Sequence, residues 1–392
     1  MISRKTNSAF FVEDSLWGVI IFFCIPAFSS TNISQLLMVA FCLYRLPVHL
    51  FRRMLYFPKI LVWLCLACFY YCIQVITLTI IGTELFDGIE GVKSVVNLLL
   101  SFVFSCLIIN YINDKPNGYV YKWITLACFL HGVIALTQYL LLLFSISSPD
   151  VADLYKGRGQ FVLRGLFSEP AHYSIYISLS IGFLLFYAER LRMNTVLLFG
   201  FLFLTIVLSK SLSGIALLLI TVIIFMFDRI SFKKMLGIVV CMLIILIYIL
   251  VDGSVLERLE RTFSLTDSSS AARLIGSWLV VLSFDEWWQF LFGIGIGNYE
   301  AFLSQSIVKL LGDVPFDNFK TWNVLAYIFS TGGLVALAFF SASILKLKQY
   351  SKRYLLIFTA SLFAHGYLFG PFFWLFLAIG VSRNKQIKSV YF

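Results

Sequence analysis

Long apolar segments separated by short polar connections run through almost the whole of this 392-residue chain. Its residues are 60% hydrophobic and 13% charged. Soluble domains contain about 45–50% apolar residues and about 25% charged residues. A soluble fold could not remove this much apolar surface from water, so most of the chain is predicted to lie in lipid. About twelve spans are predicted, at roughly 15–30, 32–47, 60–81, 91–110, 122–145, 171–188, 194–209, 212–227, 235–251, 322–345, 354–367 and 370–382. The predicted fold is an all-α polytopic membrane protein, with residues 1–392 forming a single integral membrane domain.

The distribution of charge orients these spans. With the N-terminus inside, the cytoplasmic segments contain 20 basic residues (Lys and Arg) and 5 acidic residues (Asp and Glu). The outer segments contain 10 basic and 15 acidic residues. Cytoplasmic loops of membrane proteins carry such an excess of basic residues, so both termini are predicted to be cytoplasmic. The net charge of +10 then faces anionic lipid of the inner leaflet, and nucleic acid is not a predicted partner.

Two predicted outer connections are long, at 146–170 and 252–320, and long loops in compact proteins are usually functional or disordered. The second contains an apolar run, 274–284, that is too short to span a bilayer. Because Trp287 and Trp288 follow it, the sequence predicts a re-entrant or interfacial helix on the outer surface.

Cysteine and glycine patterns predict no metal or cofactor site. All eight Cys lie in apolar segments, and the pair Cys65 and Cys68 lacks a second pair or a nearby His. The glycines of FGIGIGNYE (Gly293, Gly295 and Gly297) do not have the spacing of a dinucleotide-binding turn. They predict a tight turn in the second outer loop.

Polar residues concentrate in the stretch RGLFSEPAHYS, residues 164–174, where a helix is predicted to begin. Ser168 suits the N-cap, and Pro170 is tolerated in the first turn. One helix face, at positions i, i+3, i+4 and i+7, carries Glu169, His172, Tyr173 and Tyr176. Another face, which lipid would tolerate, carries Ile175, Leu179, Gly182 and Phe186. The polar face is predicted to line a protein interior or a water-filled cavity near the outer surface.

Basic residues flank this stretch and recur in the second outer loop. They are Lys156, Arg158, Arg164, Arg258, Arg261 and Arg273. Guanidinium groups bind phosphate oxygens through two parallel hydrogen bonds, and a helix N-terminus adds positive potential. Arginine side chains suit the phosphate of an anionic lipid-linked sugar, and aromatic side chains suit its sugar. The alternative is that Arg and Glu in these loops only pair with each other or with lipid headgroups. His131, alone within a predicted span, is interpreted as a residue of the bundle interior.

Five motifs carry a family resemblance. They are RGLFSEPAHYS at 164–174, SKSLSG at 209–214, AARLIGSW at 271–278, FGIGIGNYE at 292–300 and DNFKTWNVLAYIFSTGGL at 317–334. In their order, their predicted outer placement and the hydropathy profile of the whole chain, they resemble the bacterial O-antigen and capsular polysaccharide polymerases (Wzy type), a family related to the O-antigen ligases. The O-antigen ligases have a His-Asn pair before the helix that follows the large loop, and this chain resembles them there with Asp317 and Asn318. The missing His favours the polymerase over the ligase.

The resemblance implies a glycosyltransferase of the bacterial inner membrane without metal or cofactor. Its substrate would be undecaprenyl-diphosphate-linked oligosaccharide, and the growing glycan would move onto a new lipid-linked repeat unit at the periplasmic face. The resemblance leaves room for a chain-length regulator and a flippase of the same pathway as partners. The diphosphate-binding role falls on Arg158, Arg164 and Arg273, and the catalytic positions on Glu169 and His172. Tyr173 and Tyr176 are expected to bind sugar.

Two alternatives stay open. One is an O-antigen ligase or another transferase of lipid-linked glycans. The other is a transporter, such as a flippase for lipid-linked oligosaccharide, which would also have about twelve helices. A flippase distributes polar residues along a central pathway, whereas ionisable residues within the predicted spans are few here.

Overall fold

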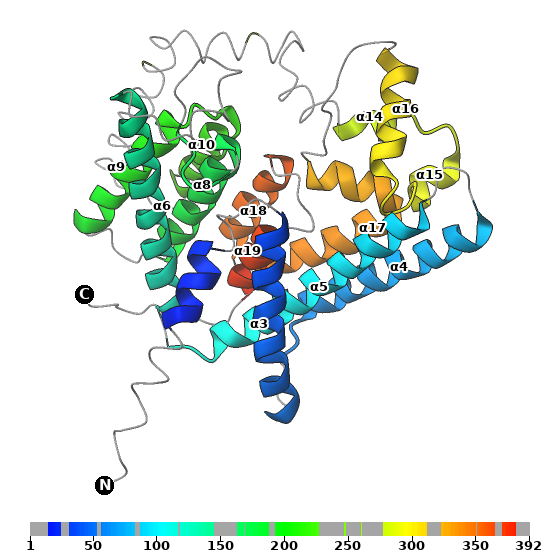
Figure 1. The fold of residues 1–392 in the computed structure, drawn as a ribbon, viewed down its shortest axis with the longest axis horizontal. Coiled ribbons are helices and arrows are strands. Elements are labelled where there is room, and N and C mark those ends of the chain that lie inside the picture. The colour runs from blue at the N-terminus through cyan, green and yellow to red at the C-terminus, as the bar shows by residue number, and fades with distance from the viewer. Residues whose placement is uncertain are drawn as a thin grey trace. The chain divides into compact units, whose positions relative to one another are not determined.

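The computed structural model describes residues 15–24, 31–52, 56–82, 87–116, 118–144, 163–167, 169–187, 193–226, 247, 260, 277–311, 323–349, 351–364 and 371–381 (Figure 1). These residues form helices, turns and short connections, and no strand occurs among them. The all-α class predicted from the apolar segments is therefore confirmed.

Several of these helices suit a membrane. The helices in the described ranges that are long and apolar enough to cross one cover Lys59–Ile81, Gly88–Asn113, Tyr119–Leu141 and Val324–Gln349. Shorter apolar helices cover Leu36–Val48, Pro170–Leu185, Leu197–Leu208 and Leu212–Phe225. The predicted span 235–251 lies almost wholly outside the described residues, so the count of twelve stays a prediction, as does the orientation of the termini.

Local signals in the sequence set the helix ends. Helix α4 (Lys59–Ile81) begins directly after Pro58 and ends at Gly82, which has the left-handed conformation (φ 66°) common after a helix C-terminus. Helix α5 (Gly88–Asn113) begins after Asp87, whose carboxylate accepts hydrogen bonds from two backbone N–H groups of the first turn.

The chain divides into two compact units, and the division falls within helix α3 (Thr31–Arg52) and within α5. The first unit comprises residues 1–41, 112–228 and 383–392, and the second comprises 42–111 and 229–382. Among the described residues, the first unit contains η2 (Ile20–Cys24), α6 (Tyr119–Leu143), α8 (Pro170–Tyr187), α9 (Met193–Leu208) and α10 (Leu212–Met226).

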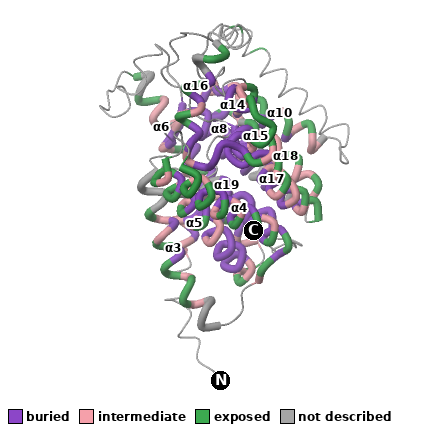
Figure 2. Tube along the Cα trace, turned by 90° about the vertical axis from the view of Figure 1, so that its right-hand side faces the viewer, coloured by how far each residue is buried: buried purple, intermediate pink, exposed green. Residues whose placement is uncertain are grey.

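Helix α8 is the centre of the first unit, where it packs against α6, α9 and α10. Every residue from 170 to 184 is buried (Figure 2). The face that lipid would tolerate, which includes Ile175 and Leu179, is therefore buried inside the unit. Lipid and protein interiors are similarly apolar, so hydropathy does not distinguish them.

Small residues bring α8 and α10 together. A Cβ atom at Gly214 would overlap the side chain of Ser174, and the Ser178 hydroxyl donates a hydrogen bond of 3.0 Å to the Gly214 carbonyl. Helices in membranes associate closely where such residues meet, because packing replaces the hydrophobic driving force that operates in water.

Adding one methyl group at Gly214 is expected to destabilise the first unit. Gly214→Ala should lower the free energy of unfolding by about 1–3 kcal/mol, the usual cost of overpacking, although alanine is the better helix former. Gly200→Ala is the matched control, because a Cβ atom there meets nothing within 4 Å. Thermal unfolding of both variants in detergent measures the difference, and equal midpoints would contradict the close contact.

The second unit is built along α17 (Val324–Lys346), which packs against α4. The Ser343 hydroxyl of α17 donates to the Ile60 carbonyl of α4 at 3.2 Å. The other elements that the structure describes in this unit are α14 (Ser277–Leu282), α15 (Trp287–Phe292), α16 (Tyr299–Leu311), η4 (Leu347–Gln349), α18 (Lys352–Ala364) and α19 (Pro371–Val381). In Figure 1 the yellow helices α14 to α16 lie at the side of the orange α17, which agrees with their contacts.

Candidate functional site

Residues 163–167, part of the predicted first outer loop, fold inward among the helices of the first unit. Leu163 and Phe167 are buried, and the Leu163 N–H donates to the Leu208 carbonyl at the end of α9 at 3.3 Å. Gly165 has φ 62°, and a Cβ atom there would lie 3.3 Å from that of Ala135 on α6. Glycine adopts this conformation more readily than other residues, so Gly165 allows the segment to pass close to α6.

The inward segment rests on a cluster of rings. His131 of α6 is 0% exposed, and its ring centroid lies 5.1 Å from that of Phe167 and 5.4 Å from that of Tyr176. The interpretation of His131 as an interior residue is confirmed. Tyr173 is also buried, with its ring centroid 5.8 Å from that of Phe167.

The predicted sugar-binding residues Tyr173 and Tyr176 therefore lie inside the first unit. The Tyr176 hydroxyl donates to the Phe22 carbonyl at 2.7 Å, which connects α8 to η2. A sugar could reach either ring only if this packing opened. Their sugar-binding role stays a prediction, and the contacts of the described residues support a packing role.

Arg164 and Glu169 lie at the edge of this packing. Both are partly exposed, whereas His172 in the first turn of α8 is 7% exposed. Helix α8 begins at Pro170 and the Tyr173 N–H donates to the Glu169 carbonyl at 3.3 Å, so the prediction that Pro170 lies in the first turn is confirmed. The Glu169 carboxylate thus precedes the positive end of the helix, a position that favours a negative charge.

The structure places one of the three predicted arginines. Arg158, Arg273 and the predicted N-cap Ser168 lie outside the described residues, as do Lys156, Arg258 and Arg261. The clamp of Arg158, Arg164 and Arg273 therefore stays a prediction.

Lys210 is a cation that sequence reasoning did not assign to the site. It lies in the turn between α9 and α10, has φ 49° and is partly exposed. The hydrogen bond from Leu163 to Leu208 brings this turn beside the residue that precedes Arg164. The motif SKSLSG could have indicated this residue, because a lysine between two apolar helices is costly in a membrane and is usually functional.

A second site of interest is a break in helix α17. Gly333 has φ 63° and ψ −161°, which interrupts the helix nine residues after it begins. The turn after α15 docks against the break, with Ile294 N–H donating to the Ser330 carbonyl and Gly295 N–H to the Thr331 carbonyl, both at 2.9 Å. Non-helical backbone at membrane depth is tolerated where protein covers it or where it lines a water-filled cavity.

Polar side chains of α4 satisfy the backbone around the break. Tyr70 Oη lies 2.8 Å from the Phe292 carbonyl and 3.0 Å from that of Gly332. The Gln74 amide nitrogen donates to the carbonyls of Phe292 and Thr331, at 2.5 and 2.9 Å. Gln74 precedes the end of α4 by seven residues, or about 10 Å of helix. The turn after α15 therefore reaches alongside the interior of a helix long enough to cross a membrane.

Glycines make this docking possible. Gly293, Gly295 and Gly297 all have positive φ, so the predicted tight turn is confirmed. A Cβ atom at Gly293 would overlap the Thr331 backbone, and one at Gly333 would overlap that of Leu291. The contact between the turn and the break was not predicted, although two adjacent glycines within an apolar run are a signal for it.

Helix α15 presents aromatic side chains outward. Trp287 is 70% exposed, and Trp288, Phe290 and Phe292 are also exposed. Aromatic residues of this kind concentrate at membrane–water interfaces. Short helices were predicted here, and their depth in a membrane stays a prediction.

Comparisons with known proteins add no family to this description. No family model matches the chain, and a search of curated proteins gives no match. The proposals for function therefore rest on the residues of the chain and on their contacts.

Proposed function

We propose that the chain is a glycosyltransferase that polymerises lipid-linked oligosaccharides, as the sequence resemblance implies. The growing glycan moves from undecaprenyl diphosphate to a sugar hydroxyl of a new lipid-linked repeat unit, at the periplasmic face of the bacterial inner membrane. The all-helical fold and the apolar helices are compatible with such a substrate, whose lipid tail stays in the bilayer.

The observation that carries this proposal is the placement of Arg164 and Glu169. Both charges are partly exposed, five residues apart, at the start of a helix that is otherwise buried over residues 170–184. A guanidinium and a carboxylate at the edge of an apolar unit offer binding for a diphosphate and acceptance of a proton. Ionisable groups in such surroundings are costly and are usually functional.

The proposed reaction forms one bond and breaks one. The acceptor hydroxyl oxygen attacks the anomeric carbon of the donor sugar, and the bond from that carbon to the diphosphate oxygen breaks. The electron pair of that bond leaves with the lipid diphosphate, and Arg164 stabilises its charge. The hydroxyl proton passes to the Glu169 carboxylate, with His172 as the second candidate for this role.

Lys210 adds a further cation for the leaving group. The hydrogen bond from Leu163 to Leu208 joins the segment that contains Arg164 to the turn that contains Lys210. Lysine binds phosphate as a point charge, whereas arginine binds through a planar fork. The two would divide the charge of a diphosphate between them.

The proposal is tested by incubating the purified protein with undecaprenyl-diphosphate-linked repeat units and resolving the products by size. A ladder of glycan lengths without a lipid A–core acceptor is the expected result. A single product that forms only with that acceptor would indicate a ligase. No glycan product from a folded protein would overturn the proposed transferase activity.

Arg164→Ala is expected to reduce the rate of ladder formation by about tenfold to a hundredfold, because a charge-assisted hydrogen bond contributes about 1.5–3 kcal/mol. Arg164→Lys should restore the rate only in part, since an ammonium group lacks the two-pronged geometry. Arg353→Ala is the control, an arginine in the first turn of α18 in the other unit. An unchanged ladder in the folded Arg164→Ala variant would remove Arg164 from the site.

The break in α17 favours transport as a second candidate function. In transporters, interrupted helices line substrate and ion sites, and unwound backbone provides ligands there. Assaying the purified protein in vesicles for passage of lipid-linked oligosaccharide between leaflets distinguishes the two functions. Passage without change in glycan length would support transport, whereas a ladder supports the polymerase.

A further inference from the structure

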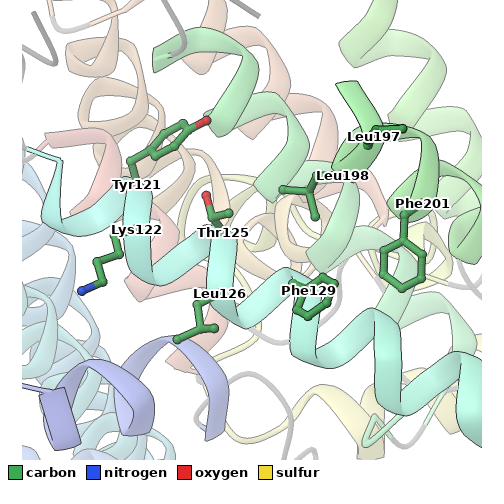
Figure 3. A pocket seen from close by; sticks show the side chains of 8 residues that line it. All are labelled: Tyr121, Lys122, Thr125, Leu126, Phe129, Leu197, Leu198 and Phe201. Atoms are coloured by element: carbon green, nitrogen blue, oxygen red, sulfur yellow. The ribbon is translucent and has the colours of Figure 1, made fainter. Parts of the chain in front are cut away.

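An apolar groove of about 630 Å³ lies between α6 and α9 in the first unit (Figure 3). Its volume falls within the range of about 300–1,000 Å³ that is usual for pockets binding small molecules. The lining residues are Tyr121, Lys122, Thr125, Leu126, Phe129, Leu197, Leu198 and Phe201. Those from α6 follow a spacing of three or four residues and so form one stripe on that helix.

Two aromatic rings mark one end of the groove. The ring centroids of Phe129 and Phe201 lie 5.9 Å apart there, and a Cβ atom at Gly132 would approach the Phe201 ring to 2.5 Å. From Tyr121 to Phe129 the stripe runs eight residues, or about 12 Å of helix. Half of a hydrocarbon core about 30 Å thick is close to this length, so the groove matches the depth of one leaflet.

The opposite end carries positive charge. Lys122 is exposed, its ammonium nitrogen lies 5.7 Å from the Trp123 ring centroid, and the described carboxylates form no ion pair with it. Lys115 lies 5.7 Å from the Tyr119 ring one turn earlier. Lysine, tyrosine and tryptophan together are typical of the membrane–water interface. This end therefore suits an anionic headgroup, to which a basic residue near the surface contributes attraction.

A polar residue lies between the charged end and the aromatic end. Thr125 lines the groove, and its hydroxyl oxygen is buried without a hydrogen-bond partner among the described residues. A buried hydroxyl without a partner costs free energy, so a ligand with an acceptor at this depth would satisfy it. Thr125 lies three residues beyond Lys122, about 4.5 Å along the helix.

We propose that this groove binds one bilayer phospholipid with an anionic headgroup. The phosphate lies at Lys122, an ester carbonyl accepts a hydrogen bond from the Thr125 hydroxyl, and an acyl chain fills the apolar stretch to Phe129. A polyprenyl phosphate has no ester carbonyl, and its chain is much longer than one leaflet is deep. The order of charge, hydroxyl and apolar wall along α6 therefore favours a glycerophospholipid, whatever reaction the protein performs.

Native mass spectrometry of the purified chain in detergent tests the proposal by titration with phosphatidylglycerol. We expect one tightly bound molecule, and phosphatidylcholine with the same acyl chains should bind at least about fivefold more weakly. The ether-linked analogue of phosphatidylglycerol, which lacks the carbonyls, should bind about two- to tenfold more weakly, the effect of one hydrogen bond. Equal binding of phosphatidylglycerol and phosphatidylcholine, or tighter binding of undecaprenyl phosphate than of phosphatidylglycerol, would overturn the proposal.

Variants separate the three parts of the groove. Lys122→Glu should remove the preference for the anionic headgroup, and Thr125→Val the preference for the ester over the ether. Leu198→Trp should fill the groove and abolish the tight binding. The controls are Lys348→Glu, an exposed lysine elsewhere, and Leu204→Trp, a 47% exposed leucine of α9 outside the groove. If Leu198→Trp and Leu204→Trp bind phosphatidylglycerol equally, the lipid lies elsewhere.

Discussion

Glu169→Gln is expected to slow glycan polymerisation by about 10²–10⁴-fold while leaving the protein folded. That factor corresponds to about 3–5 kcal/mol of activation free energy. Glutamine keeps the size and much of the hydrogen bonding of glutamate, but it cannot accept the proton of the acceptor hydroxyl. Because Glu169 is partly exposed at the start of α8 whereas Tyr173 is buried, the substitution is expected to leave the packing around Tyr173 unchanged.

The measurement is the initial rate of ladder formation with the lipid-linked repeat unit. Glu300→Gln is the matched control, since Glu300 is an exposed carboxylate in the first turn of α16. A folded Glu169→Gln variant that builds full-length glycan at close to the parental rate would show that Glu169 is not the base. His172→Gln would then be compared, because His172 is the nearest other titratable group on the same helix face.

The positions of the helices could be predicted where the sequence marks their ends. The predicted span 60–81 agrees with α4 to within one residue, because Pro58 and Gly82 bound it. The predicted span 171–188 likewise agrees with α8, which begins at Pro170. Proline and glycine act through the backbone, so their effect does not depend on what surrounds the helix.

The surroundings of each helix could not be predicted from hydropathy. The face with Ile175 is one that lipid would tolerate, but α8 is buried over residues 170–184 and packs against α6, α9 and α10. Tyr173 and Tyr176 share a helix face with Glu169 as predicted, yet they lie in the interior, whereas Glu169 is partly exposed. Helix periodicity predicts which side chains are neighbours on one face. How far each side chain is buried depends on the packing of other helices around it.

Gly333 accounts for a larger omission, because the predicted span 322–345 was continuous and α17 is broken. An apolar run with two adjacent glycines is compatible with a straight helix that packs closely and with an interrupted one. What decides between them is Gln74 and the turn after α15, which come from distant parts of the sequence and satisfy the freed backbone groups. A local pattern cannot report such partners.

Gly333→Ala is expected to destabilise the second unit by about 3 kcal/mol or more. A residue with a side chain at φ 63° and ψ −161° costs about 1–3 kcal/mol, and its Cβ atom would also overlap the Leu291 carbonyl group. Gly82→Ala is the matched control. Gly82 has φ 66° but a Cβ atom there meets nothing within 4 Å, so its substitution should cost only about 1–2 kcal/mol.

Hydrogen exchange locates the effect of this substitution. The Ile294 and Gly295 N–H groups donate across the break, so Gly333→Ala should increase exchange in a peptide that covers residues 289–297. Gly82→Ala should leave exchange in that peptide unchanged, because Gly82 lies at the end of α4, away from Tyr70 and Gln74. Equal unfolding midpoints for the two variants, with unchanged exchange at 289–297, would mean that the turn does not depend on the break. If the exchange increases as expected, the turn after α15 is held to α17 by backbone contacts that only glycine permits.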